Sequence, residues 1–144
     1  MVTTLNSTSR TPRVSIITPA YNAEAHLGET IESVLVQSAP DLEMVIVDDG
    51  SSDGTLEVAH TYARLDRRIR VFRQNNSGVC VARNTALAHA RGSIIALLDS
   101  DDVWMADYLG VQLALFEQLP TASIITVNAI NRGGARDGQP LSEC

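Results

Sequence analysis

The sequence predicts an α/β protein with a doubly wound parallel sheet, and three observations support that prediction. Strand-like and helix-like segments alternate along most of the 144 residues, which is the order of connected βαβ units. The run Ile94–Leu98 holds five apolar residues in succession, which is typical of a strand buried on both faces of a parallel sheet. Carboxylates directly follow two of the apolar runs, where ligands bind in open α/β folds.

The first part of the chain predicts a strand, a helix and a second strand. Val14–Thr18 is a short β-rich run, and Pro19 follows it as a loop residue. From Glu24 onward the apolar residues recur at helical spacing, until Pro40 breaks the helix. Met44–Val47 is the second apolar run and predicts the next strand.

The middle of the chain repeats this pattern. The turn at 51–54 is rich in Ser, Asp and Gly and introduces a helix from Thr55 to about Leu65. Ile69–Arg73 alternates apolar and basic residues, which suits a more exposed strand. A second turn at 75–78 precedes a helix through Ala90. The apolar side chains that we expect to face inward from this helix are Val79, Ala82, Ala86 and Leu87.

The remaining elements complete the alternation. Gly92 stops the preceding helix and Ile94–Leu98 follows as the fourth strand. A helix is expected over about Met105–Gln118, and Ser123–Val127 has the composition of a fifth strand. We expect residues 1–12 to be a flexible N-terminal tail and residues 13–144 to form one domain.

Composition excludes several classes of protein. Hydrophobic residues make up 44% and charged residues 19% of the sequence, which argues against a disordered chain. The net charge of −6 argues against a nucleic-acid-binding role, although a metal ion still allows an anionic nucleotide to bind. No stretch approaches the ~20 apolar residues of a transmembrane segment. The two cysteines, Cys80 and Cys144, form no disulfide framework, which fits a reducing compartment.

Two acidic clusters are the strongest indication of function. Asp48 and Asp49 follow one apolar strand, and Asp99, Asp101 and Asp102 follow another. The carboxyl ends of parallel strands share one edge of a sheet, so both clusters are expected in one crevice. Crowded carboxylates repel one another unless a cation joins them. The sequence therefore predicts a divalent-metal site, and a metal there suggests a phosphorylated ligand.

Four blocks of the chain resemble the family 2 glycosyltransferases, in that family's order and spacing. They are Val14–Asn22, Val45–Thr55, Asn76–Asn84 and Leu97–Asp102. The resemblance implies a GT-A fold, a Rossmann-like parallel-sheet domain that binds a nucleotide-diphospho-sugar. It also implies transfer of the sugar with inversion, as in the synthesis of cell-envelope polysaccharides.

The resemblance assigns the nucleotide side of the site. Pro19 ends the first strand, and Tyr21 would lie against the nucleobase, where aromatic stacking is worth about 1–3 kcal/mol. Asp49 matches the aspartate that hydrogen-bonds the base, and a carboxylate accepts the N3–H of uracil, so a uridine nucleotide is expected. Asp48 is expected to brace the loop. Glu24 is placed either on the nucleotide side or at a helix N-terminus, where the dipole favours a carboxylate.

The resemblance also assigns the diphosphate side. Asp99, Ser100 and Asp101 match the family's DXD motif. Asp99 would contact the ribose and, through water, the metal, while Asp101 would ligate Mg²⁺ or Mn²⁺. Arg83 would approach the diphosphate or form a salt bridge on its helix. Asp102 is equally compatible with a helix cap.

The sequence departs from the family in one respect. Inverting transfer needs a general base for the acceptor hydroxyl, and in this family that carboxylate and the acceptor-binding half come from a later segment. We therefore expect a GT-A domain incomplete at its C-terminus, with no catalytic base before Cys144. The acceptor, a saccharide or a lipid-linked molecule, is not identified. The expected location is cytoplasmic, either free or peripheral to the inner face of the membrane.

Two other functions compete with transfer. A catalytically incomplete fragment that binds a nucleotide-sugar would carry the same four blocks. A metal-dependent phosphotransferase has similar Asp-rich motifs, but such an enzyme uses a supporting lysine, and this sequence contains none.

Overall fold

The computed structural model describes residues 11–130 and 137–140, so nearly all of the tail predicted at residues 1–12 lies outside the described residues. Strands and helices alternate as the sequence predicts. The strands are β1 (Val14–Ala20), β2 (Leu42–Asp48), β3 (Ile69–Arg73) and β4 (Ile94–Leu97). The helices are α1 (Leu27–Leu35), α2 (Thr55–Leu65), α3 (Val79–His89) and α4 (Tyr108–Gln118).

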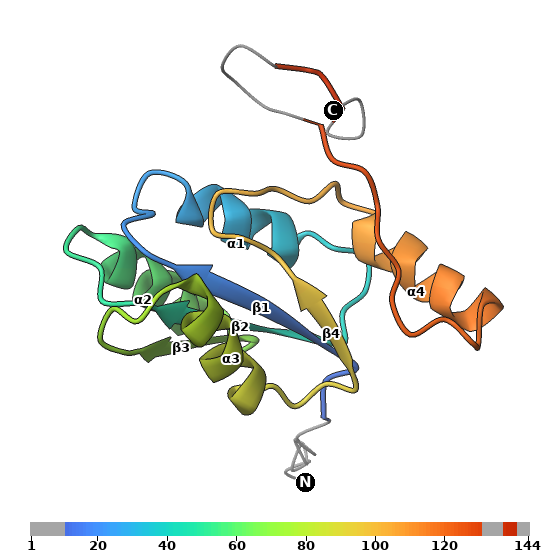
Figure 1. Ribbon diagram of the computed structural model, residues 1–144, viewed down its shortest axis with the longest axis horizontal. Coiled ribbons are helices and arrows are strands. Elements are labelled where there is room, and N and C mark those ends of the chain that lie inside the picture. Colours follow the sequence, from blue (N-terminus) through green and yellow to red (C-terminus); the bar gives the residue numbers. More distant parts are fainter. Residues whose placement is uncertain (1–10, 131–136, 141–144) are drawn as a thin grey trace, which may run out of the picture. The chain divides into compact units, whose positions relative to one another are not determined.

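The four described strands form one parallel sheet in the order β3-β2-β1-β4 (Figure 1). The chain moves outward from β1 through β2 to β3, and then returns to the other side of β1 with β4. Right-handed crossovers place α1 and α2 on one face of such a sheet and α3 on the other. The predicted α/β parallel sheet is therefore confirmed, and its strand order reverses between β1 and β4, where α/β proteins bind ligands.

The core is centred on β1 and β2, whose residues are all buried. On the α3 face, alternate residues of the two strands pack against the small residues of the helix. This cluster contains Ile17, Val45, Val47, Ala82 and Ala86, with Phe72 of β3 at its margin. Because alanines face the sheet, α3 approaches β1 and β2 closely. The helix follows β3, a parallel strand, so its N-terminus lies at the carboxyl edge of the sheet.

The expectation that Ile94–Leu98 is buried on both faces is wrong. Ile95 is 39% exposed and Leu97 is 62% exposed. The register pairs Leu97 with Ile17 and Ile95 with Ser15, so both lie on the α3 face of β4. β4 is an edge strand of the described sheet, and α3 covers its neighbours rather than β4 itself.

Three smaller expectations also need correction. Among the described residues, Ser123–Val127 is not a strand, because no strand pairs with it and two of its apolar side chains, Ile124 and Val127, are 79% and 51% exposed. The last helix begins at Tyr108 rather than near Met105. Val79 and Leu87 of α3 are about half exposed instead of facing inward. Helical spacing identified the helix. Of the four side chains expected to face inward, only those of Ala82 and Ala86 are buried, and their small size lets the helix approach the sheet closely.

The chain divides into two compact units, residues 1–109 and 110–144. The first unit contains all four described strands and the helices α1, α2 and α3. The second contains most of α4 and an isolated antiparallel bridge between Ile130 and Pro140. Within the described residues, no helix combines the length and apolar character needed to cross a membrane.

Candidate functional site

A cleft of about 390 Å³ opens at the carboxyl edge of the sheet, where β1, β2 and β4 end. Five of the residues predicted for the site line it: Pro19, Tyr21, Asp49, Asp99 and Asp101. The rest of the lining consists of Ala20, Asn76, Gly78, Val79, Ala82 and Ser100. Each of the two acidic clusters predicted from the sequence therefore contributes to one crevice, although Asp48 and Asp102 are not among its lining residues.

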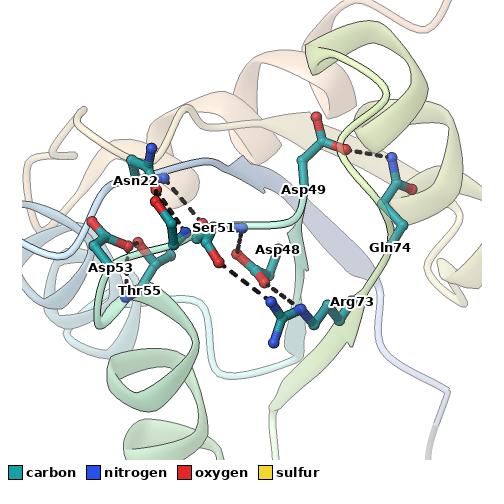
Figure 2. A network of polar contacts seen from close by, with 9 residues as sticks. Asn22, Asp48, Asp49, Ser51, Asp53, Thr55, Arg73 and Gln74 are labelled. Carbon is teal, nitrogen blue, oxygen red and sulfur yellow. Dashed lines mark hydrogen bonds and ion pairs between the residues drawn. The ribbon is translucent and has the colours of Figure 1, made fainter.

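The two aspartates at the end of β2 have opposite orientations (Figure 2). Asp48 is fully buried, accepts a hydrogen bond from the backbone N–H of Ser51 at 3.2 Å, and pairs with Arg73 Nε at 3.3 Å. Asp49 turns the other way and contributes to the lining of the cleft. The strand period of two accounts for this, since successive side chains point to opposite faces.

Asp49 is held by three N–H donors from the loop before α3. Gln74 Nε2 donates to Oδ1 at 2.8 Å, the backbone N–H of Ser77 donates to the same oxygen at 2.9 Å, and the backbone N–H of Gly78 donates to Oδ2 at 2.8 Å. Burial alone raises the pKa of this carboxyl, but the three hydrogen bonds together hold it below its ordinary value. Asp49 is therefore an ionised and positioned acceptor.

Gly50 allows the loop before α3 to lie against the end of β2. It has a positive φ of 75°, a conformation that favours glycine. A Cβ at this position would lie 2.8 Å from the backbone nitrogen of Asn76, which itself lines the cleft. The close approach places Asn76, which lines the cleft, against the end of β2.

The loop after β1 carries Tyr21 and is bound to the loop after β2 (Figure 2). Asn22, which has a positive φ of 48°, accepts a hydrogen bond from the backbone N–H of Ser52 through Oδ1 at 2.9 Å. Its own backbone N–H donates to Ser51 Oγ at 3.0 Å. These bonds fix the loop while Tyr21 remains 53% exposed beside the cleft.

Glu24 does not line the cleft. Its Oε2 accepts a hydrogen bond from the backbone N–H of Gly54 at 2.9 Å, and its own N–H donates to Asp53 Oδ2 at 3.2 Å. Gly54 is the N-cap of α2, where a carboxylate is favourable. Glu24 thus lies at the N-terminus of α2, rather than at that of the helix that follows it in sequence. Its role in nucleotide binding stays a prediction.

Arg83 and Asp99 form an ion pair at the side of the cleft. Arg83 Nη2 donates to Asp99 Oδ1 at 2.5 Å, and the two side chains are 35% and 46% exposed. The bond to Asp99 raises the pKa of the guanidinium. Arg83 Nε is buried and has no hydrogen-bond partner among the described residues. Arg83 is therefore close to the acidic cluster without itself lining the cleft.

The acidic loop after β4 concentrates negative charge. Partial burial of the carboxyl, followed by repulsion from Asp101 and from Asp99, raises the pKa of Asp102. Asp102 also donates its backbone N–H to the carbonyl of Asp99 at 3.2 Å, which closes a turn. The loop thus brings three carboxylates together, of which Asp99 and Asp101 line the cleft.

The carboxylates of Asp99 and Asp101 suit Mg²⁺ or Mn²⁺, because both ions prefer oxygen ligands. In the part of the chain that the structure describes, no group of three or more His, Cys, Asp or Glu side chains is arranged to hold an ion alone. Mg²⁺ is commonly bound by one or two carboxylates together with substrate phosphates and water. The donor set therefore fits an ion that binds together with a phosphorylated ligand.

Sequence reasoning missed several parts of this site. Asn76, Gly78, Val79 and Ala82 line the cleft, and Gln74 orients Asp49. The block Asn76–Asn84 contained the available signal, since it matched the family although only its Arg83 was given a role. No pattern in the sequence pointed to Gln74.

Comparisons with known proteins identify the family of the chain. The sequence model described as glycosyl transferase family 2 matches residues 15–143. TuaG of Bacillus subtilis (strain 168), a glycosyltransferase assigned to teichuronic acid biosynthesis, is 45% identical over 133 residues, which are 92% of this chain and 52% of TuaG. The chain therefore spans about half the length of this relative.

Two solved structures are similar to the chain. Residues 1–349 of S. aureus TarS in complex with UDP-GlcNAc give a TM-score of 0.69 at 32% identity, over 74% of this chain and 31% of that one. The mannosyltransferase PcManGT from Pyrobaculum calidifontis, in complex with GDP-Man and Mn²⁺, gives a TM-score of 0.66 at 29% identity, over 83% and 35%. With the family match over nearly the whole chain, these findings show that the protein belongs to glycosyl transferase family 2 and has the GT-A fold.

Proposed function

We propose that the cleft binds a UDP-linked sugar donor together with Mg²⁺ or Mn²⁺, for transfer of the sugar to an acceptor with inversion. The observation that carries the proposal is the meeting of Tyr21, Asp49, Asp99 and Asp101 around one cleft. An aromatic ring, a single carboxylate and a carboxylate pair match the base, its edge and the diphosphate of such a donor. The TarS complexes with UDP and with UDP-GlcNAc support the choice of nucleotide.

The base is proposed to bind between Tyr21 and Asp49. Tyr21 is half exposed and offers a ring face for stacking. A carboxylate has about four acceptor positions, and three of those on Asp49 are taken by Gln74, Ser77 and Gly78. One position remains on an acceptor that lines the cleft, which suits the single N3–H donor of uracil.

The diphosphate is proposed to bind beside the acidic loop. Asp101 would hold the metal ion directly and Asp99 would contact the ribose and, through water, the ion. When bound, the ion supplies positive charge that stabilises the leaving nucleoside diphosphate. Arg83, already paired with Asp99, adds a guanidinium that suits phosphate oxygens.

The acceptor side of the reaction is proposed to need further residues. The carboxylates that line the described cleft are Asp49, Asp99 and Asp101, and each has a role on the donor. A general base for the acceptor hydroxyl would therefore come from residues outside this lining. The likeness to TuaG supports a saccharide or lipid-linked acceptor in cell-envelope polysaccharide synthesis. Binding of the donor without transfer is the corresponding alternative for this chain.

Calorimetric titration of UDP with and without Mn²⁺ tests the proposal. We expect Mn²⁺ to strengthen UDP binding. Asp101→Ala should lower the UDP affinity measured with Mn²⁺ by roughly tenfold or more, as loss of a group that supports a metal does. Asp107→Ala, which changes an aspartate outside the cleft lining, is the matched control. GDP is the comparison nucleotide and should bind more weakly than UDP.

Two results would contradict specific parts of the proposal. Equal binding of UDP with and without Mn²⁺ would show that the site does not use the metal to bind UDP. Equal effects of Asp101→Ala and Asp107→Ala would show that Asp101 does not bind the metal. Circular dichroism and thermal unfolding of each variant establish that it is folded before its titration is interpreted.

A further inference from the structure

We propose that Thr30 on α1 is a positioning residue for the acidic loop, which here means residues 99–102. This inference deepens the proposed function and rests on it for its effect on donor binding. α1 is not part of the cleft lining, yet the helix bonds directly to the backbone between the two carboxylates that are.

A buried polar stripe runs along one face of α1 and beyond its end. Thr30, Ser33 and Gln37 follow a spacing of three and then four residues, which places them on one side of a helix. Their exposures are 0%, 5% and 6%. Buried polar side chains are costly unless they are hydrogen-bonded, so the stripe needs partners.

Two partners are backbone carbonyls of α1 itself, since Ser33 Oγ donates to Thr30 at 2.7 Å and Gln37 Nε2 donates to Ser33 at 2.9 Å. The others lie in the segment that follows β4. Thr30 Oγ1 donates to the carbonyl oxygen of Ser100 at 2.9 Å, and the backbone N–H of Trp104 donates to Ser33 Oγ at 3.2 Å. Gln37 Nε2 donates to the carbonyl of Met105 at 2.7 Å, while its Oε1 accepts from the backbone N–H of Leu109 at 2.9 Å. Three side chains of the stripe thus satisfy four backbone groups.

The segment depends on these bonds because it has little regular structure of its own. From residue 98 to residue 107 the chain is neither helix nor strand, so its buried backbone groups must find partners elsewhere. Asp102 N–H bonds to Asp99, but that turn alone does not attach the loop to the sheet. The backbone N–H of Leu98 bonds to Ile17 of β1, and the backbone N–H of Ser38 bonds to the carbonyl of Ala106. Between these two points the stripe attaches the segment to α1.

Thr30 has the most direct connection to the site. Ser100 lies between Asp99 and Asp101, and the bond from Thr30 holds its carbonyl on the side of α1. Both flanking carboxylates line the cleft. Without the hydroxyl, the Ser100 carbonyl loses its side-chain partner and the carboxylates lose a fixed point between them.

The test compares Thr30→Val with Thr61→Val in the full chain. Valine keeps the shape of threonine and removes the hydroxyl. Thr61 is the matched control, because its Oγ1 donates to the carbonyl of Glu57, four residues earlier in α2, at 2.8 Å, as Thr30 also bonds His26 at 3.4 Å. Thr30→Ser keeps the hydroxyl and should behave as the wild type.

The first measurement is hydrogen–deuterium exchange without any ligand. We expect Thr30→Val to speed exchange about threefold to tenfold at the Asp102 amide, within peptides covering 99–103. This amide bonds to the carbonyl of Asp99 in the turn that the Thr30 bond to Ser100 holds. Thr61→Val should leave these peptides unchanged. The second measurement is UDP binding, where Thr30→Val should reduce the Mn²⁺-dependent increase by a similar factor and leave metal-free binding within about twofold.

The two measurements separate this inference from the proposed function. Unchanged exchange at 99–103 in folded Thr30→Val would overturn the positioning role, whatever the titrations show. Wild-type protein that does not bind UDP would instead overturn the proposed function, and the exchange result would still decide whether Thr30 holds the loop. If Thr30→Val does not fold, Thr30→Ala, which also removes the bond to Ser100, takes its place with the same expectations for residues 99–103.

Discussion

Asp48 and Asp49 are neighbours in sequence, and the structure gives them different tasks. Asp48 is buried against Arg73 and the turn at Ser51, so it holds the end of β2 in place. Asp49 is held by three N–H donors with its remaining acceptor capacity at the cleft. At the scale of single residues, Asp49 is therefore an acceptor that other groups hold in position at the cleft.

Replacing Asp49 by asparagine should weaken both the fold and nucleotide binding. An amide has one oxygen, so its NH₂ group must face a backbone N–H that now donates to Asp49, and a lost partner of this kind costs about 1–3 kcal/mol. Urea unfolding at neutral pH measures the loss. Glu57→Gln, at an exposed carboxylate in the first turn of α2, is the control and should cost only the ~0.3–1 kcal/mol of a carboxylate at a helix N-terminus.

The lowered pKa of Asp49 predicts how the stability loss in Asp49→Asn changes with pH. The pKa of Asp49 is lowered in the folded protein, so its contribution is fully present above the ordinary value near 3.8 and is lost as pH falls through the lower folded value. The stability difference between wild type and Asp49→Asn should therefore shrink at acid pH. A difference that grows as pH falls would contradict the assignment.

At the scale of the elements, the opposite edge of the sheet carries a buried polar cluster that joins the strands. Glu43 of β2 accepts from Ser15 Oγ at 2.7 Å and from the backbone N–H of Arg91 at 2.7 Å, and pairs with Arg70 of β3 at 3.0 Å. Ser15 Oγ also accepts from the backbone N–H of Gly92 at 2.8 Å. The cluster thus links β1, β2 and β3 to the connection between α3 and β4.

Glu43→Gln should destabilise the protein by about 1–3 kcal/mol, because one amide NH₂ replaces an oxygen that accepts hydrogen bonds in a buried position. Burial raises the pKa of Glu43, but hydrogen bonds from Ser15, Arg91 and Arg70 hold it below its ordinary value near 4.5. The stabilisation is therefore present above pH ~4.5 and decreases as pH falls through the folded pKa. Thermal unfolding from pH 7 to pH 3 measures this.

The same substitution distinguishes the two edges of the sheet. UDP affinity of folded Glu43→Gln should match that of the wild type, because the cluster lies at the edge opposite the cleft. A loss of affinity as large as the one expected for Asp49→Asn would show that the two edges are coupled.

At the scale of the whole molecule, all residues that line the cleft belong to the unit formed by residues 1–109. The stripe on α1 and its partners, through Leu109, belong to the same unit. The proposed donor site therefore needs no described residue of the second unit.

Saturating UDP with Mn²⁺ should protect the first unit selectively. A ligand at about one hundred times its Kd stabilises the state that binds it by about 2.7 kcal/mol. Hydrogen exchange should slow around residues 19–24, 74–82 and 98–102, and stay unchanged over residues 110–130. Slower exchange in that last range would mean that the second unit takes part in donor binding.

Much of the site was predictable because parallel strands expose their carboxyl ends together. The apolar runs before Asp49 and Asp99 predicted buried strands, and both aspartates line one cleft. The exposure of Leu97 was not predictable, because the apolar run does not say whether a strand is central or at an edge. The position of Glu24 was missed because its partner, Gly54, follows another strand.

The sequence by itself determined the family, the alternation of strands and helices, and the residue types that gather at the carboxyl edge. These follow from the local spacing of apolar residues and from the order of the motifs in the sequence. Only the tertiary structure decided which groups hold Asp49, and that Thr30 bonds to Ser100, because those contacts join residues 25 to 70 positions apart. Their geometry depends on how loops from separate strands pack, and no local pattern records it.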